Sequence, residues 1–327
     1  MKKLVSIICI ITLLIVSVFP VSAADDGNQQ TMSEVEMTAK RINAELFGKS
    51  KDEVAKSILR EFGMPENLVS GVSSEDLDMV YNSKTISVNS QYGKVSSDGK
   101  VTLLTNEEAM IEKEQRNKNK GEPSARTIDP ETNGYTDTDT LFHKFLFVLE
   151  SVDSPAGTVG IISAFYWLDE PFYRCWDVVA ITGGNIVINV QTTKLTVVYT
   201  EQIEDLYLST TTVSNIEENF DFGELDREGN ALYNGNFIGV KFDMPEDSYL
   251  PTMLWMYNNI GVLLSVRAAV THPQLVTSLS ATGWYFHQKL GIEWDISLSK
   301  DEATLNISPA WLYDDPHQIQ VSTRYSP

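Results

Sequence analysis

The spacing of apolar residues changes along the chain and divides it into parts with different predicted structures. Between residues 31 and 82, apolar positions recur every three or four residues, first at Val35, Ala39, Ile42 and Leu46. This spacing puts side chains on one face of a helix. Further stripes follow a capping box at 50–53 and a Ser pair near 74. Residues 24–82 therefore predict a module of three short helices, which either stands alone or packs on a larger domain.

The periodic signal weakens over residues 83–136, which we interpret as a mixed connector and linker. Thr85–Val88 and Lys100–Leu104 are candidate short strands, and Thr105–Glu108 is a capping box that precedes a polar helix. Residues 117–124 have the polar, Gly- and Pro-containing composition of a linker. Because exposed polar connectors are sites of proteolysis, residues 24 to about 126 are alternatively a pro-region that is released there.

From residue 137 onwards the apolar period becomes two. Residues 292–298 alternate without a fault, as a half-buried antiparallel strand does. Turn signals at Gly183–Asn185 and Asn234–Gly235 predict two hairpins, whereas the apolar run 261–270 fits either a central strand or a short helix. About ten candidate strands with no long helix between them favour an antiparallel β-sandwich or jelly roll over residues 137–327. The predicted fold class is thus mostly β, with a small α-helical N-terminal module.

Residues 1–23 have the three parts of a secretory signal peptide. Lys2 and Lys3 precede an apolar stretch over residues 4–19, and Val21-Ser22-Ala23 matches a small-x-small cleavage site. We expect cleavage after Ala23 and a secreted, extracellular protein. No later segment is apolar over the roughly 20 residues that a transmembrane helix needs. Cleavage leaves only Cys175, so we expect no intrachain disulfide.

The charge balance limits the classes of partner. The chain has 45 acidic and 25 basic side chains, a formal net charge of −20. An acidic surface repels phosphate backbones and anionic lipids, so we expect no nucleic-acid partner. The hydrophobic fraction of 42% is high enough for a packed core, which argues against a disordered acidic chain.

Motifs for catalysis and for metal binding are missing from the sequence. It contains no Gly-x-Ser-x-Gly, His-Glu-x-x-His or Cys-x-x-Cys pattern, and no two of its four histidines have the spacing of a zinc pair. Calcium is the metal with some support, from carboxylates at 137–139, 217–228 and 314–315. These groups fall short of the 6–8 oxygens that calcium takes. We therefore predict no metal site and no cofactor.

Aromatic residues are dense around residue 170, and four residues there are the candidate ligand site: Trp167, Asp169, Tyr173 and Trp176. Neighbouring side chains on a strand point to opposite faces, so some of these rings leave the core side if only one face is covered. An outward ring beside a carboxylate can stack on a sugar. The alternative, which the usual burial of large aromatics favours, is that both faces are covered and the rings belong to the core.

These features favour a non-catalytic extracellular binding or adhesion protein whose ligand is a glycan or a cell-surface protein. The alternative is a secreted polysaccharide hydrolase that uses two carboxylates of the β domain. That activity requires a cleft and one carboxyl group with a raised pKa. The sequence does not define an oligomeric state.

Overall fold

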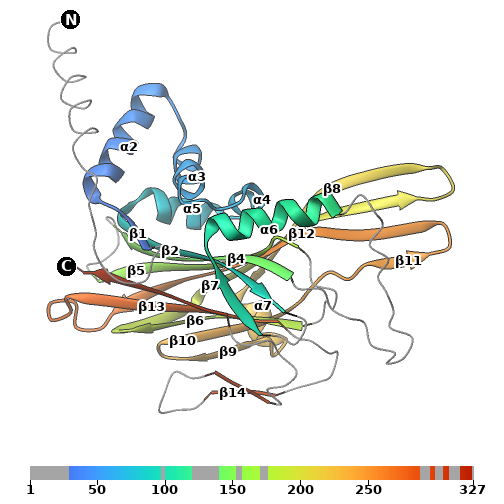
Figure 1. The fold of residues 1–327 in the computed structure, drawn as a ribbon. Helices are drawn as coiled ribbons and strands as arrows, with labels where there is room; N and C mark the ends of the chain where they lie inside the picture. The colour runs from blue at the N-terminus through green and yellow to red at the C-terminus, as the bar shows by residue number, and fades with distance from the viewer. Residues whose placement is uncertain are drawn as a thin grey trace, which may run out of the picture.

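The computed structural model describes residues 29–96, 100–119, 140–151, 157–169, 176–287, 295–298, 305–308 and 317–325. The predicted signal peptide, most of the linker, the acidic groups at 137–139 and 314–315, Tyr173 and Cys175 lie outside these residues. In the described part, two antiparallel sheets pack face to face, and helices cover the outer face of the larger sheet (Figure 1). The predicted antiparallel sandwich with a small helical part is confirmed.

The larger sheet has nine strands, and three of them lie well before residue 137. In spatial order its main path consists of β1 (Gln29–Met32), β2 (Ser83–Val95), β4 (Thr140–Ser151), β5 (Thr158–Trp167), β12 (Met253–Val270), β7 (Ile186–Asp205) and β8 (Thr210–Asp221). Two short strands pair beside this path, β3 (Val101–Leu104) on β2 and β11 (Ser248–Leu250) on β12. The region read as a connector therefore supplies β2 to the interior of this sheet.

The smaller sheet has five strands, in the order β16 (His317–Arg324), β13 (Ser278–Phe286), β6 (Trp176–Gly184), β10 (Phe237–Asp243) and β9 (Ala231–Asn234). A separate two-stranded sheet pairs β14 (Asp295–Leu298) with β15 (Leu305–Ser308). The described helices are α2 (Glu34–Phe47), α3 (Lys51–Glu61), α4 (Glu66–Ser70), α5 (Ser74–Tyr81), α6 (Asn106–Asn119) and α7 (Phe222–Arg227). None of the helices in these residues is both long and apolar enough to cross a membrane.

The three adjacent aromatic residues at the end of strand β5 are all buried. Phe165 and Trp167 point into the core between the two sheets, whereas Tyr166 points into the core between the large sheet and the helices. All three side chains are at most 8% exposed. Because side chains alternate along a strand, a sheet covered on both faces buries every position. The interpretation of these rings as core residues is correct for β5.

The helices that the sequence predicts form as α2, α3, α5 and α6, whereas α4 and α7 are not predicted. Helix α2 is oriented differently from a simple amphipathic expectation. Capping boxes at Ser33 and Ser50 start α2 and α3, and α3 to α5 pack on the large sheet through a shared hydrophobic core. In α2 the buried side chains are Met37 and Ala44. The predicted apolar face of α2 instead points to solvent, with Val35 63% and Leu46 69% exposed.

One of the two predicted hairpins is wrong. The turn at Gly183–Asn185 joins β6 to β7, and these strands belong to different sheets. Asn185 has a left-handed φ of 63°, and a Cβ on Gly183 would lie 2.2 Å from Ile186 Cδ1, so the turn is tight. It takes the chain from the smaller sheet to the larger one. The Asn234–Gly235 turn does join the paired strands β9 and β10. The ambiguous run 261–270 is part of the central strand β12.

Candidate functional site

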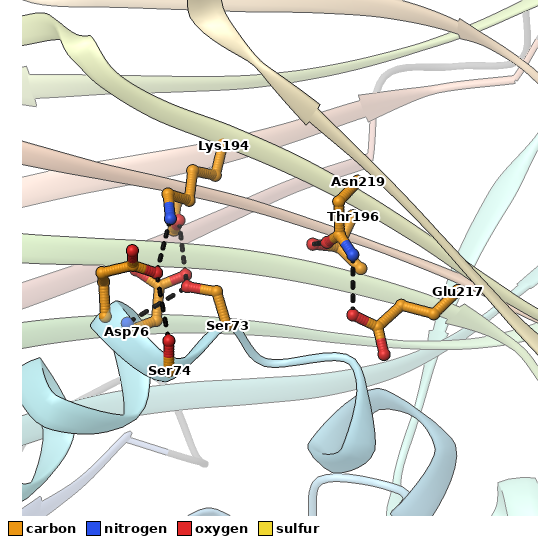
Figure 2. Close-up of polar contacts among 9 residues, drawn as sticks. Ser73, Ser74, Asp76, Lys194, Thr196, Glu217 and Asn219 are labelled. Carbon is orange, nitrogen blue, oxygen red and sulfur yellow. Dashed lines mark hydrogen bonds and ion pairs between the residues drawn. The ribbon is translucent and has the colours of Figure 1, made fainter.

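A polar pocket opens where the N-terminus of α5 faces strands β7 and β8, with a volume of about 300 Å³. We call it the α5 pocket. Its lining consists of Ser73, Ser74, Glu75, Lys194, Glu217, Asn219, Phe220 and Asp221. Figure 2 shows two groups of polar side chains in this region, one in which Lys194 meets residues at the start of α5 and one that contains Asn219 and Glu217 of β8.

The register of β7 and β8 places polar side chains on the helical face of the sheet. Lys194 pairs with Asp221 and Thr196 with Asn219 across the two strands, so their side chains share one face. Val198, two residues further along β7, belongs to the core under the helices, which identifies this face. Phe220 alternates to the other face, where it packs against the core between the sheets. The pocket therefore offers polar groups rather than an aromatic ring.

The turn before α5 lies close to the sheet. A Cβ on Gly71 would lie 2.4 Å from Val198 Cγ1, so only glycine lets the backbone approach β7 this closely. Two residues later, Ser73 caps α5 by accepting a hydrogen bond from the Asp76 amide at 3.2 Å. This local sequence brings the first turn of α5 against Lys194.

Two hydrogen-bonded groups form the walls of the pocket (Figure 2). On one wall, Lys194 Nζ donates to Glu75 Oε2 at 2.6 Å. On the other wall, Thr196 Oγ1 donates to Asn219 Oδ1 at 2.7 Å, and Asn219 Nδ2 donates to Glu217 Oε1 at 2.8 Å. The polar side chains are thus held in fixed directions by one another, which is how a binding site is preorganised.

Glu75 and Asp76 in the first turn of α5 have opposite pKa shifts. The hydrogen bond from Lys194 holds the pKa of Glu75 below its ordinary value, so Glu75 is anionic at neutral pH. Burial raises the pKa of Asp76, although its Oδ2 accepts hydrogen bonds from Ser73 at 2.9 Å and from Ser265 at 2.8 Å. Asp76 therefore ties α5 to β12, and the anionic group on this side of the pocket is Glu75.

This arrangement suits binding by hydrogen bonds better than hydrolysis. A glycosidase needs a carboxyl group with a raised pKa that faces the substrate, and the shift of Glu75 has the opposite sign. Three carboxylates against one lysine also make the pocket unfavourable for an anion. Among the described residues, no three His, Cys, Asp or Glu side chains are grouped so that they could hold a metal ion.

The four residues predicted as the ligand site have different environments. Trp167 is 1% exposed, and its Nε1 donates to Tyr285 Oη at 3.2 Å inside the sandwich. Asp169 pairs with Arg116 Nη1 of α6 at 3.0 Å. Trp176 is partly exposed at the start of β6, where Lys241 Nζ lies 4.2 Å from its ring centroid. Tyr173 lies outside the described residues, so the four-residue site stays a prediction, but Trp167 is a core residue.

A buried polar cluster in the sandwich was missed by sequence reasoning. Asp177 is fully buried, accepts a hydrogen bond from Tyr285 Oη, and lies 3.0 Å from His287 Nδ1 through its other oxygen. The sequence interpretation treats His287 as an ordinary strand or turn residue. Asp177 lies 108 residues before Tyr285 and 110 residues before His287, so the three residues share no motif spacing. The lining of the α5 pocket was missed for the same reason.

No family model matches this chain, and no curated protein matches its sequence. Among solved structures, the collagen-binding subdomain of the Enterococcus faecalis surface protein ACE is 7% identical, with a TM-score of 0.26. The match covers 53% of this chain and 90% of the ACE subdomain. The collagen-binding domain of a Staphylococcus aureus adhesin is 6% identical, with coverages of 53% and 92% and a TM-score of 0.27. AvmM, which catalyses macrocyclization in alchivemycin A biosynthesis, is 11% identical, with coverages of 53% and 83% and a TM-score of 0.21. Likeness at this level carries no information about a ligand.

Proposed function

We propose that the protein is a non-catalytic extracellular binding protein and that its α5 pocket binds the hydroxyl groups of a glycan. The observation that carries the proposal is the convergence of hydroxyl, amide, ammonium and carboxylate groups from α5, β7 and β8 on one opening. Such a set can both donate to and accept from a polyol. The N-terminal leader pattern supports export.

The polarity of the pocket favours a neutral ligand of this kind. A sugar hydroxyl donates to a carboxylate such as Glu217 and accepts from an ammonium group such as Lys194, so it suits both walls. Because the ring of Phe220 faces the core, the proposed recognition depends on hydrogen bonds and not on stacking. A small set of well-placed polar groups is what fixes the orientation of a ligand in such sites.

Binding to an oligosaccharide array, followed by titration calorimetry with the strongest ligand, tests the proposal. In the variant Asn219→Ala the affinity is expected to fall by about tenfold or more, the effect of losing roughly one to two hydrogen bonds. The matched control is Asn215→Ala. Asn215 lies on the same strand and accepts from Thr200 as Asn219 accepts from Thr196, but it does not line the pocket.

Unchanged affinity in the control together with the loss in Asn219→Ala supports the proposal. Equal effects of the two substitutions would show that the ligand binds elsewhere. An array on which the protein binds no oligosaccharide would contradict the glycan assignment.

A further inference from the structure

Helix α2 presents an apolar stripe to solvent. Val35 is 63%, Ile42 44% and Leu46 69% exposed, and Ala39 between them is partly exposed. We call these four residues the α2 stripe. Their spacings of four, three and four residues are those of alternate a and d positions in a heptad repeat, which is the seam of a helix pair. Phe47, at the end of the helix, is 78% exposed beside it.

The opposite side of α2 fixes the helix on the protein. Met37 and Ala44 are buried there, and Arg41 Nη1 donates to the carbonyl oxygens of Tyr81 at 3.2 Å and Ser83 at 3.3 Å. Lys40 forms an ion pair with Glu61 of α3. Because these contacts define the rotation of α2 about its axis, the stripe is held facing outward. In Figure 1, α2 is the outermost helix of its layer.

Both ends of α2 are fixed by its own sequence. Ser33 and Glu36 form a capping box at the start, and Gly48 ends the helix in the left-handed conformation with a φ of 65°. The helix is therefore formed before any partner binds. A continuous apolar stripe on a preformed helix differs from single exposed apolar residues, which are ordinary on protein surfaces.

The charges at the two ends of α2 indicate which partner fits. The first turn carries the acidic residues Glu34 and Glu36, the last turn carries Glu45 and no basic residue, and the basic Lys49 follows the C-cap Gly48. If a second copy packs antiparallel, Glu34 and Glu36 in the first turn of each helix lie on the side of Lys49 of the other copy. Antiparallel helix dipoles also attract each other.

The apolar positions are self-complementary in the same arrangement. With the twofold axis between Ala39 and Ile42, Val35 faces Leu46 of the second copy and Ala39 faces its Ile42. A larger side chain then meets a smaller one at each level, which is how helix seams interdigitate. Flanking Glu45 comes opposite Thr38 of the second copy, so no two carboxylates face each other directly there.

We propose that the α2 stripe is a homodimer interface in which two α2 helices pair antiparallel. One helix pair of this length covers less than the roughly 800 Å² per partner of a standard interface, and the acidic proteins repel each other at long range. The dimer is therefore expected to be weak and to dissociate on dilution.

Sedimentation velocity of the purified protein over about 1 to 100 µM, the range for a small interface, tests the proposal. The sedimentation coefficient of the wild type should rise with concentration, and the variant Ile42→Glu should remain monomeric at every concentration. The control Val213→Glu changes another exposed apolar residue, 60% exposed on β8, and should dimerise like the wild type. Thermal melting checks that each variant is folded.

Disulfide trapping tests the direction of pairing, in variants whose native cysteines, Cys9 and Cys175, are replaced by Ser. A chain with both Val35→Cys and Leu46→Cys should form a covalent dimer on oxidation. The two positions are about 16 Å apart along one helix, so they cannot bridge within a chain. Val35→Cys alone should not cross-link, since antiparallel pairing puts the two copies of residue 35 at opposite ends.

Three results would overturn the proposal. A wild type that stays monomeric over the whole range excludes the dimer, and an Ile42→Glu variant that still dimerises places the interface elsewhere. The third is a monomer that sediments with neutral phosphatidylcholine vesicles and loses this binding in Ile42→Glu, which would assign the stripe to a lipid surface.

Discussion

The two faces of the nine-stranded sheet differ in how completely they are covered. The inner face packs against the five-stranded sheet, and the core between them is closed by large apolar side chains. The outer face is covered by short helices, which bury a second core but leave the α5 pocket open and the α2 stripe exposed. Both faces belong to the same strands, so the difference lies in what covers them: the inner face is closed, and the surfaces that we propose for binding lie on the helical side.

The largest expected effect is on the inner face. Phe165 is 2% exposed and stacks on Tyr285 with ring centroids 3.7 Å apart. The change Phe165→Ala should lower the free energy of unfolding by about 3 to 5 kcal/mol, because it removes a buried ring and leaves a cavity. Leu46→Ala on α2 should cost less than about 0.5 kcal/mol. Urea denaturation measures both, and similar losses would contradict the difference between the faces.

The second effect is a pH dependence that arises from Lys144 in the sandwich. This side chain is 3% exposed, and burial lowers its pKa from 10.5 to about 7. Between these values the unfolded chain binds a proton that the folded protein does not, so the free energy of unfolding rises with pH. The slope from this group is at most about 1.4 kcal/mol per pH unit.

Urea denaturation at pH 7 and pH 9 measures this dependence. The variant Lys144→Met, which keeps most of the volume without the amine, should show a smaller increase in stability between the two values than the wild type. If the wild type and Lys144→Met show the same pH dependence of stability, Lys144 is not buried as the neutral amine.

The third prediction concerns the turn that shapes the α5 pocket. Because a Cβ on Gly71 would lie 2.4 Å from Val198 Cγ1, Gly71→Ala must displace the turn before α5. We expect a loss of about 1 to 3 kcal/mol in the free energy of unfolding, typical of overpacking, together with weaker ligand binding. Gly223→Ala is the control, since a Cβ there meets no atom within 4 Å. Equal stability of the two variants would argue against the close approach.

The smallest effect is expected at the start of α3. Ser50 accepts a hydrogen bond from the Glu53 amide at 3.2 Å, and the Ser50 amide donates to Glu53 Oε2 at 2.8 Å. The change Ser50→Ala should cost about 1 kcal/mol, the usual value of an N-cap, whereas Ser57→Ala in the same helix should cost much less. Thermal melting compares the two, and a cost at Ser57 that matches Ser50 would contradict the capping role.

Local patterns predicted the elements well and their surroundings poorly. Apolar spacing located α2, a capping box located α3, and period-two alternation identified the antiparallel strands, because all three signals depend on neighbouring residues. The orientation of α2 was not predictable, since either of its faces can be buried until the sheet beneath it is known. Gly183–Asn185 has the chemistry of a hairpin turn, and only the strand pairing shows that the chain changes sheets there.

The candidate site depends on contacts between distant parts of the chain. Glu75 and Lys194 are 119 residues apart and meet only because α5 packs on β7. No spacing in the sequence joins them. The aromatic residues around Trp167 stand out in the sequence and suggested a ligand site. Trp167 nevertheless lies in the core, because the sheet is covered on both faces.

Hydrogen–deuterium exchange with a bound oligosaccharide tests the proposed site most directly. Backbone amides of residues 73–76 and 217–221 should exchange more slowly with the ligand, while those around Trp176 and Lys241 should not change. Protection confined to the region of Trp176 and Lys241, with none at the N-terminus of α5, would contradict the assignment of binding to the helical side of the sheet.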